Sequence, residues 1–380
     1  MRVCSPHCGL EAETTSGGET YERELLTHLA RLGMVCDLIL ARHKRVPEGV
    51  PNLIAHRLPI ARGLRWPVAA LVFPPFIKRV FDQTRFDLLR AHSLRYVGPA
   101  VLWARRRYRL DVPVVCHHHH LDPSRLNPII DKRVLDASDR VITVSEFSKR
   151  QLVSSLGVDG DHVEVVANGV DERFSPGPTD EALRSRLGLG SGPVALFLGG
   201  LKPRKSLPFL LDVWRAVATA RPEATLIVAG TGPLEAELRA QAERLALGRQ
   251  VIFTGRVPEA DKVGYYRLAD LFVFPSSLEG FGLVVGEAMS CGLAVVTSDQ
   301  GALPELVVDG RGGMVCPDRD LAAFTRAVMQ LLDAPDLRAR LGGFNRDRVE
   351  QRFRWDRAAR RVLDIYDEVL ADWKRGVRPR

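Results

Sequence analysis

The sequence predicts an α/β protein of two domains, each built around a doubly wound parallel β-sheet. The chain has 380 residues, which is too long for one ordinary hydrophobic core and comfortable for two. Short apolar runs rich in β-branched residues alternate with helical patterns along its whole length, as in βαβ units. This alternation begins again at 194–198, so we expect a second series of strands there.

The first series of elements begins at the N-terminus. The first helix is predicted near 19–32, where leucines recur at helical spacing at positions 25, 26, 29 and 32. The strands of this series are predicted at 1–4, 35–40, 52–57, 87–91, 113–117, 140–144 and 163–166.

The second series follows a linker, which we predict at the loop-like stretch S-P-G-P-T-D, 175–180. A long amphipathic helix is predicted over 353–370. The expected domains are therefore 1–175 and 176–355, with 356–380 as a C-terminal helix. The strands of the second series are predicted at 194–198, 225–229, 251–254, 271–274, 294–297 and about 313–315.

The composition is that of a soluble globular protein, with 46% hydrophobic and 26% charged residues. Polar residues such as Ser5, His7 and Glu11 interrupt any apolar run near the start, so we expect no signal peptide. No apolar run reaches the roughly 18 residues of a membrane span. The six cysteines are scattered, which indicates reduced thiols in the cytoplasm. Cys4 and Cys8 have the spacing of a metal-binding pair, but no second pair completes a site.

The positive charge of the chain is concentrated in the segment 57–109. It holds twelve Arg and Lys residues and two Asp residues, which gives the segment a net charge of +10. This exceeds the formal net charge of +8 of the whole chain. Within it, residues 65–81 mix bulky apolar side chains with flanking cations, a composition that suits a surface on anionic lipid at the inner face of a membrane. A buried helix ringed by solvated arginines explains the same pattern. No aromatic-interleaved module predicts nucleic acid as a partner.

The stretch 275–292, P-S-S-L-E-G-F-G-L-V-V-G-E-A-M-S-C-G, carries the clearest functional pattern. Gly280 and Gly282 leave backbone N–H groups uncovered where a helix begins near Leu283, which predicts an anion site. Glu279 and Glu287 flank this site, and in a continuous helix they would be about 12 Å apart. A retaining glycosidase needs its two carboxylates at about 5 Å, so the spacing suits two ends of one long ligand instead.

This stretch resembles the signature of the retaining glycosyltransferases of family 4. The resemblance implies the GT-B fold: two Rossmann-like domains with the active site in the cleft between them, and a C-terminal helix that crosses back to the first domain. It also implies sugar transfer from a UDP- or GDP-sugar with retention of anomeric configuration. Further stretches that carry the resemblance are 137–150, 165–174, 196–206, 226–234 and 251–257.

The resemblance implies roles for residues of the second domain. Lys205 and Arg204, in the loop G-G-L-K-P-R-K, would stabilise the charge of the departing diphosphate. Relatives often have an arginine where this chain has Gly200, so we expect Arg204 to supply the second cation. Glu279 would contact the transferred sugar and Glu287 the ribose hydroxyls. Further donor contacts are expected from the backbone of Val257 to the base and from the amides of Gly280, Phe281, Gly282, Leu283 and Val284.

In the first domain, the resemblance places Gly17 and Gly18 near the donor phosphates and one histidine of C-H-H-H-H, 116–120, near the reacting sugar. We choose His119, with His118 second. On an extended strand, residues 117 and 119 face one side, and 118 and 120 face the other. No carboxylate or cysteine completes a metal site with them.

Two other motifs are set aside. D-R-D at 318–320 mimics a metal-binding motif but opens a predicted helix, Leu321–Leu332, as an N-cap. A-G-T-G-P-L at 229–234 lacks the third glycine of a dinucleotide fingerprint.

Together with these patterns, the resemblance implies a retaining hexosyltransferase in which the acceptor attacks the donor from the front face. We expect it to need no cofactor or metal and to build a cell-envelope glycan or a glycolipid on a glycan or lipid-linked acceptor. A sugar-nucleotide epimerase of similar fold and a non-catalytic sugar-nucleotide binding protein stay as alternatives.

Overall fold

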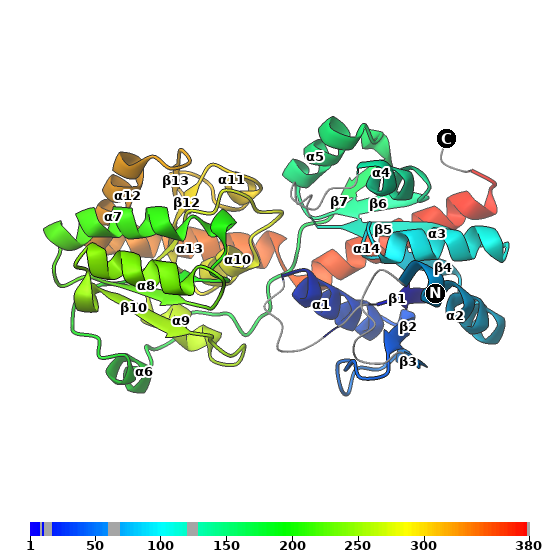
Figure 1. The fold of residues 1–380 in the computed structure, drawn as a ribbon, viewed down its shortest axis with the longest axis horizontal. Coiled ribbons are helices and arrows are strands. Elements are labelled where there is room, and N and C mark those ends of the chain that lie inside the picture. Colours follow the sequence, from blue (N-terminus) through cyan, green and yellow to red (C-terminus); the bar gives the residue numbers. More distant parts are fainter. Residues whose placement is uncertain (8–9, 11–16, 60–68, 120–127, 378–380) are drawn as a thin grey trace. The chain divides into compact units, whose positions relative to one another are not determined.

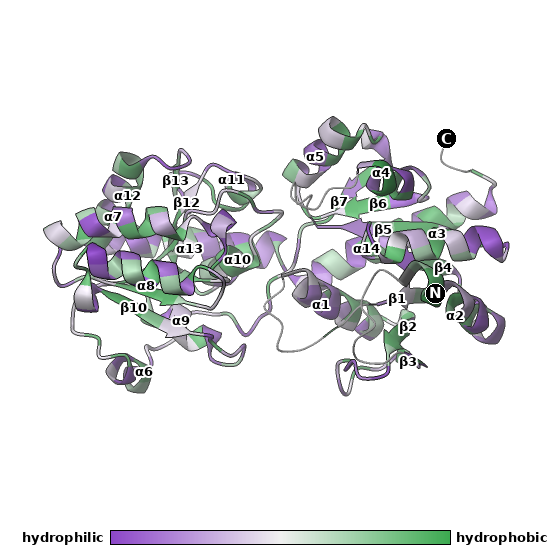
Figure 2. Ribbon diagram, viewed as in Figure 1, coloured by the Kyte–Doolittle hydropathy of each residue, from purple (hydrophilic) through white to green (hydrophobic). Residues whose placement is uncertain are grey.

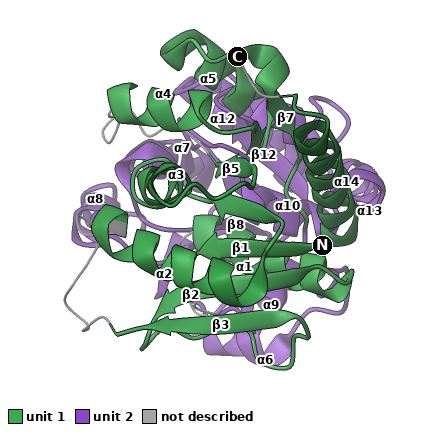
Figure 3. Cartoon of the chain, turned by 90° about the vertical axis from the view of Figure 1, so that its right-hand side faces the viewer, with its two compact units in different colours: residues 1–169, 355–380 green, residues 170–354 purple. Residues whose placement is uncertain are grey.

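The computed structural model describes residues 1–7, 10, 17–59, 69–119 and 128–377 (Figure 1). The chain forms two compact units, Met1–Gly169 with Trp355–Arg380, and Val170–Arg354 (Figure 3). Each unit is built around one parallel sheet, which confirms the predicted fold class. Every strand predicted from the sequence is present, with bounds that differ by a residue or two.

The sheet of the first unit has seven strands in the order β3-β2-β1-β4-β5-β6-β7. The order reverses direction between β1 and β4, which is the switch point of a doubly wound sheet. The strands are β1 (Arg2–Pro6), β2 (Val35–Ala41), β3 (Leu53–Leu58), β4 (Leu88–Ala91), β5 (Val114–His118), β6 (Arg140–Thr143) and β7 (Val163–Val165).

The helices of the first unit cover its sheet in two groups. Helix α2 packs against α3, α3 against α4, and α4 against α5, whereas α1 packs against the C-terminal helix α14. Both α2 and α14 carry hydrophilic and hydrophobic residues along their lengths, as surface helices do (Figure 2). The helices are α1 (Gly17–Arg31), α2 (Ala69–Thr84), α3 (Val97–Arg107), α4 (Pro128–Asp136), α5 (Glu146–Leu156), η2 (Gly160–His162) and α14 (Trp355–Lys374).

The apolar part of the segment 65–81 is buried in some places and exposed in others. Residues 65–68 lie outside the described residues. From Ala69 onward the segment is helix α2, which buries Phe73, Ile77 and Val80 in the core against α3. Leu71, at the start of the same helix, is 66% exposed. The helix is therefore anchored on one face, and its first turn leaves an apolar side chain at the surface.

The second unit repeats the architecture with six strands in the order β10-β9-β8-β11-β12-β13, which reverses between β8 and β11. Its strands are β8 (Val194–Leu198), β9 (Thr225–Ala229), β10 (Val251–Gly255), β11 (Leu271–Phe274), β12 (Ala294–Ser298) and β13 (Gly313–Cys316). Its helices are α6 (Glu181–Arg186), η3 (Pro203–Lys205), α7 (Leu207–Ala220), α8 (Glu235–Arg244), η4 (Gly248–Gln250), α9 (Lys262–Leu268), α10 (Leu283–Ser290), α11 (Leu303–Leu306), α12 (Leu321–Asp333) and α13 (Pro335–Arg352).

The D-R-D motif is an N-cap, as predicted. The side chain of Asp320 accepts a hydrogen bond from the backbone N–H of Ala323 in the first turn of α12. A carboxylate at this position also interacts favourably with the positive end of the helix dipole. The motif is thereby explained by the helix that it begins.

The chain passes between the two units at residues that are neighbours in the structure. Val170 N–H donates to Phe353 O at 2.8 Å, and Val170 forms a parallel bridge with Arg354. Gly169 lies so close to Trp355 that a Cβ on the glycine would be 2.4 Å from Trp355 atoms. The sequence placed the boundaries at 175 and 355, whereas the units divide at 169/170 and 354/355, because these backbone bonds hold Val170 to the second unit.

None of the helices among the described residues combines the length and the apolar character that a membrane span needs.

Candidate active site

The candidate site of the second unit lies at the switch point of its sheet. Loops at the carboxyl ends of strands bind ligands at such points in doubly wound folds. The loop after β8 leads into η3, which carries Arg204 and Lys205. The loop after β11 carries Ser276 and Glu279. The fold therefore brings residues of two separate sequence motifs to one end of the sheet.

Glu279 is the centre of a buried polar network. The Arg204 guanidinium donates to Glu279 Oε1 at 2.6 Å, and the Lys205 ammonium donates to the same oxygen. Ser276 Oγ also donates to this oxygen, at 2.6 Å. Three donors thus converge on one oxygen, whereas Oε2 has no hydrogen-bond partner among the described residues.

The surroundings of Lys205 set its charge. Its side chain is buried, with Nζ 4.5 Å from the ring centroid of Phe274. Burial lowers the pKa of the Lys205 ammonium to about 8, while the Glu279 carboxylate opposes this shift and Arg204 adds to it. Burial alone would raise the pKa of Glu279, but the charges and hydrogen bonds of Lys205 and Arg204 outweigh it and hold that pKa below its usual value. Near neutral pH the two residues form an ion pair that an incoming anion must share or displace.

The start of helix α10 adds backbone donors to the same loop. Gly282 precedes the helix at φ +98°, a conformation that favours glycine, and no side chain caps the helix. The N–H groups of Leu283 and Val284 have no acceptor within the part of the chain that the structure describes. They point along the positive end of the helix dipole, as in anion sites. Phe281 is different, because its ring packs against Phe353 and leaves only its backbone for a ligand.

Glu287 belongs to a second network, separate from that of Glu279. Tyr266, from α9, donates its hydroxyl to Glu287 Oε2 at 2.7 Å, and Lys262 Nζ lies 3.6 Å from the same oxygen. Burial raises the pKa of Glu287, and the Lys262 charge opposes this only in part. The two glutamates therefore have different partners and environments.

Glycines let the loops after β8 and β9 pack closely behind the cations. A Cβ on Gly230 would lie 1.9 Å from the carbonyl oxygen of Gly199, and one on Gly232 would lie 2.4 Å from Leu201 O. The A-G-T-G-P-L motif is thus explained by backbone packing. Gly200 lies in the same loop, and a Cβ there would be 3.6 Å from Cε of Lys202, so the Lys202 side chain lies beside it. Val257 follows β10, an edge strand.

The first unit has its own buried ion pair at the edge where β1 and β4 end. Arg90, from β4, is fully buried and contacts both carboxylate oxygens of Glu22 in α1, with Nη2 2.9 Å from Oε1. Its Nε donates to Tyr366 Oη, in α14, at 3.1 Å. Burial alone would raise the pKa of Glu22, but the Arg90 charge, aided by His119 and His7, holds it well below the usual value. Arg90, one of the twelve Arg and Lys residues of the segment 57–109, is therefore buried in the interior of the first unit.

The histidine run has the predicted alternation. His117 is 1% exposed, with Nδ1 3.3 Å from Tyr21 Oη and Nε2 2.7 Å from Tyr366 Oη. His119 lies on the same side, where its ring meets Tyr21 edge to face at 4.4 Å. His118 is buried, and residue 120 lies outside the described residues. Only the side chain of His119 keeps a substantial exposed part, 21%, among the described residues of the run.

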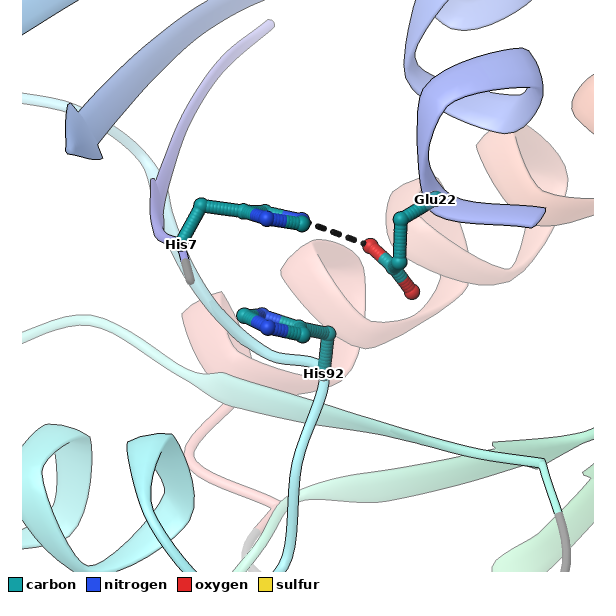
Figure 4. A group of neighbouring side chains, drawn as sticks. All are labelled: His7, Glu22 and His92. Carbon is teal, nitrogen blue, oxygen red and sulfur yellow. Dashed lines mark hydrogen bonds and ion pairs between the residues drawn. The ribbon is translucent and has the colours of Figure 1, made fainter. Parts of the chain in front are cut away.

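His7, Glu22 and His92 place three potential metal ligands within 4.8 Å of one another (Figure 4). Their geometry favours a hydrogen-bonded cluster instead. The rings of His7 and His92 are stacked nearly parallel, at 3.8 Å and 7°, so their in-plane lone pairs do not converge on one point. Glu22 already accepts from Arg90 on both oxygens, and His7 Nε2 lies 3.0 Å from Oε2.

The structure thus joins Arg204, Lys205 and Glu279 directly, with Gly280, Phe281 and Gly282 in the same loop and Leu283 and Val284 in the first turn of α10. Gly17 and Gly18 begin α1, the helix that carries Glu22. Sequence reasoning missed a set of polar partners: Glu22, Arg90, Lys262, Tyr266, Ser276 and Tyr366. The available local signal was Arg90 itself, a charged residue within the apolar strand β4, since a buried charge requires a partner.

A cavity of about 280 Å³ lies elsewhere, at the amino end of β6. Its lining includes Asp139, Arg140, His162 and Trp373. Ligands of doubly wound sheets bind at the carboxyl ends of the strands, so this cavity is not part of the candidate site.

Two family models match the chain. The model described as glycosyl transferases group 1 matches residues 179–348, and the model described as glycosyltransferase family 4 matches residues 15–174. Together they cover most of both units. The candidate site residues of the second unit lie within the first match.

Curated relatives carry related names. The chain is 33% identical over 313 residues to D-inositol 3-phosphate glycosyltransferase 2 of Catenulispora acidiphila, covering 76% of this chain and 72% of that protein. It is 31% identical over 287 residues to a GDP-mannose-dependent alpha-(1-6)-phosphatidylinositol monomannoside mannosyltransferase of Mycolicibacterium smegmatis, covering 72% of this chain and 74% of the relative.

Solved structures share the fold. Sucrose-phosphate synthase from Thermosynechococcus elongatus superposes with a TM-score of 0.82 at 22% identity, over 97% of this chain and 99% of that chain. The Anabaena protein HepE in complex with UDP-glucose gives a TM-score of 0.78 at 20% identity, over 97% of this chain and 100% of that chain.

Proposed function

Because the chain belongs to the group 1 glycosyltransferases of family 4, we propose that it transfers a hexosyl group from a nucleoside diphosphate sugar to an acceptor hydroxyl with retention of anomeric configuration. The observation that carries this proposal is that Lys205 and Arg204 both contact Glu279. The loop that carries Glu279 leads directly into the N-terminus of α10 and its backbone N–H groups. Those cations and amides match a diphosphate in charge and hydrogen bonding. Glu279 and Glu287 would then hold the sugar and the ribose on either side of it.

The chemistry follows from the charge that develops. When the glycosidic bond to the diphosphate breaks, negative charge grows on the phosphate oxygens, and Lys205, Arg204 and the amides stabilise it. Glu279 and Glu287 lie in separate networks, so neither serves as partner of a close nucleophile–acid pair. This supports front-face attack, in which the acceptor hydroxyl gives its proton to the departing phosphate oxygen. The positive charge comes from side chains, so we propose that no metal is required.

The donor and acceptor classes rest on the relatives. HepE was solved with UDP-glucose, and the mannosyltransferase of M. smegmatis is named for GDP-mannose and a phosphatidylinositol mannoside. These names support a UDP- or GDP-sugar as donor and a glycan or lipid-linked acceptor in cell-envelope synthesis. The direct test incubates the protein with UDP- and GDP-hexoses and lipid or polyol acceptors, with and without EDTA. We expect an α-linked product at the same rate in both arms; an isomerised donor without a glycosidic product would instead indicate an epimerase.

The affinity for a nucleoside diphosphate is expected to depend on the Lys205 charge. The pKa of about 8 means that the free protein loses this positive charge as the pH rises above 8. UDP binding should therefore weaken by roughly fifteenfold between pH 8 and pH 9.5, with a slope that approaches tenfold per pH unit at the upper end. Isothermal titration calorimetry across this range measures the slope. A Lys205→Arg protein keeps its charge, so its slope should be flat; equal slopes in both proteins would contradict the assignment.

Glu279 competes with the diphosphate for the same two cations. Replacing it by glutamine removes a negative charge beside the phosphates, so we expect Glu279→Gln to bind UDP roughly tenfold more tightly. Transfer should nevertheless fall, because the carboxylate contact with the donor sugar is lost. Calorimetry with UDP and steady-state kinetics with the sugar nucleotide separate the two effects. Weaker UDP binding, or unchanged transfer, would show that Glu279 does not have this position.

The segment 57–109 is proposed to contact anionic lipid. Helices α2 and α3 pack side by side and expose Leu71 and Trp103 together with Arg106 and Arg107. Apolar side chains among cations suit a negatively charged membrane surface. We expect co-sedimentation with vesicles that contain phosphatidylglycerol, reduced in an Arg106→Glu, Arg107→Glu protein. Binding that is equal on neutral phosphatidylcholine vesicles would exclude an electrostatic contact.

A further inference from the structure

We propose that Glu22 is a positioning residue that orients the ring of His119 toward the substrates of the transfer reaction. This inference deepens the proposed function and rests on it for the identity of those substrates. The contacts that carry it lie entirely within the first unit, at the carboxyl end of its sheet. Glu22 touches no substrate in this proposal; it acts through the histidine.

The first contact is between the two side chains themselves. His119 follows β5, and its Nε2 lies 3.4 Å from Glu22 Oε1. This nitrogen is buried and makes no well-aligned hydrogen bond, and the Glu22 carboxylate is a charged group that lies against it. The ring is further held by its edge-to-face contact with Tyr21. Because Nε2 is buried, the exposed fifth of the side chain belongs to its other atoms, and the remaining ring nitrogen among them is Nδ1.

The second observation is that Glu22 cannot turn away. Arg90 contacts both of its oxygens, and His7 Nε2 lies 3.0 Å from Oε2. Arg90 is in turn bonded to Tyr366, which also reaches His117. A buried ion pair of this kind adds little net stability, because both ions lose their hydration. Its clear structural effect is a fixed direction for the carboxylate, and one oxygen of that carboxylate is aimed at His119.

A fixed carboxylate selects one tautomer of a neutral histidine. Glu22 accepts a hydrogen bond and donates none, so it favours the proton on Nε2 of His119. The lone pair is then on Nδ1, at the exposed edge, where it accepts a hydrogen bond from a sugar or acceptor hydroxyl. No proton is transferred to Glu22 in this scheme. The geometry assigns it only the orientation and the tautomer of the ring.

The neighbouring histidines do not offer the same arrangement. Both ring nitrogens of His117 already meet tyrosine hydroxyls, and its side chain is almost completely buried. Burial, followed by the charge of Arg90, holds the pKa of His117 well below its usual value, so it stays neutral as part of the interior. His118 faces the other side of the strand. His119 is therefore the residue of the described run that combines an exposed edge with a buried carboxylate.

The test is a double-mutant cycle on transfer. We expect Glu22→Gln to lower kcat by about tenfold, the lower end of the usual cost of losing a residue that orients a functional histidine. UDP affinity should not change. In a His119→Ala background the same substitution should cost nothing further in kcat. The matched control is Glu24→Gln, on the same helix, whose carboxylate pairs with Arg23 and should leave kcat unchanged.

A loss of stability alone would not produce this pattern of kcat values. Glu22→Gln leaves Arg90 without its counter-ion, so the unfolding temperature should fall equally in both backgrounds. A kcat loss that persists in the His119→Ala background would show that Glu22 acts on the fold alone and would overturn the proposal.

A second measurement needs neither a variant of Glu22 nor activity. Long-range ¹H–¹⁵N spectra of ¹⁵N-histidine-labelled wild-type protein report the tautomer of His119, identified by the signal that His119→Ala lacks. The Nε2–H form is expected at alkaline pH, and the Nδ1–H form would overturn the proposal. If no nucleotide sugar supports transfer, the proposed function fails, and this spectrum still decides the Glu22–His119 contact.

Discussion

Replacing Lys205 with alanine is expected to lower kcat/KM for sugar transfer by about 10²–10³-fold, the usual cost of removing one group that stabilises developing charge. The ammonium is buried against Phe274 and shares Glu279 with Arg204, so water does not replace it easily. The loss should appear in kcat as well as in KM, because the negative charge on the diphosphate is greater in the transition state than in the bound donor. Steady-state kinetics with a saturating acceptor measure it.

Lys202 provides the matched control for this substitution. It is an exposed lysine of the same loop, so Lys202→Ala should change kcat/KM far less. If both variants lose the same activity, the loop contributes only its overall positive charge, and the specific role of Lys205 is wrong. Thermal unfolding of both proteins shows whether the fold is kept.

The second large effect is expected at Gly342, in α13. A Cβ there would lie 1.8 Å from the carbonyl oxygen of Gly292, which follows α10. Alanine must therefore push α13 away from the end of the helix that carries Glu287, and we expect Gly342→Ala to destabilise the second unit by about 3 kcal/mol. Chemical denaturation measures the change.

The neighbouring Gly343 provides the matched control for this substitution. It is exposed in the same helix, and a Cβ there would meet nothing within 4 Å. Gly343→Ala should stabilise the protein by roughly 0.5–1 kcal/mol, because alanine loses less conformational freedom than glycine in a helix. Two adjacent glycines thus have opposite predicted signs. If both variants lost stability, the contact with the Gly292 carbonyl oxygen would not explain the loss at Gly342, and the prediction would be wrong.

The fold was predictable because its sheets are parallel and buried. Strands such as Val194–Leu198 and Leu271–Phe274 are short apolar runs between loop-forming residues, and their hydrogen bonds need no particular side chain. The boundary between the two units was harder to predict from the sequence. The stretch 175–180 has the composition of a linker, yet Arg267 holds it to the second unit through Ser175, and the crossing occurs at 169/170.

The candidate site was predictable only in part. Lys205 and Glu279 lie in loops directly after strands, where motif and topology both indicate a ligand. Glu22, Arg90 and Tyr366 gave no such signal, because each has the local sequence of an ordinary helix or strand. Their relation depends on tertiary packing that brings α1, β4 and α14 together. An arginine in an apolar strand was the one local anomaly, since a buried charge requires a partner.

The adjacency of Val170 to Arg354, and of Gly169 to Trp355, has a consequence for protein engineering. Residues 170–354 form one uninterrupted insertion into the first unit, and the two ends of this insertion are hydrogen-bonded neighbours. Adjacent ends of this kind favour excision, transplantation and circular permutation, because a short linker can join the cut ends of either unit. The second unit, which we propose binds the nucleotide sugar, is therefore a segment that can be exchanged as a whole.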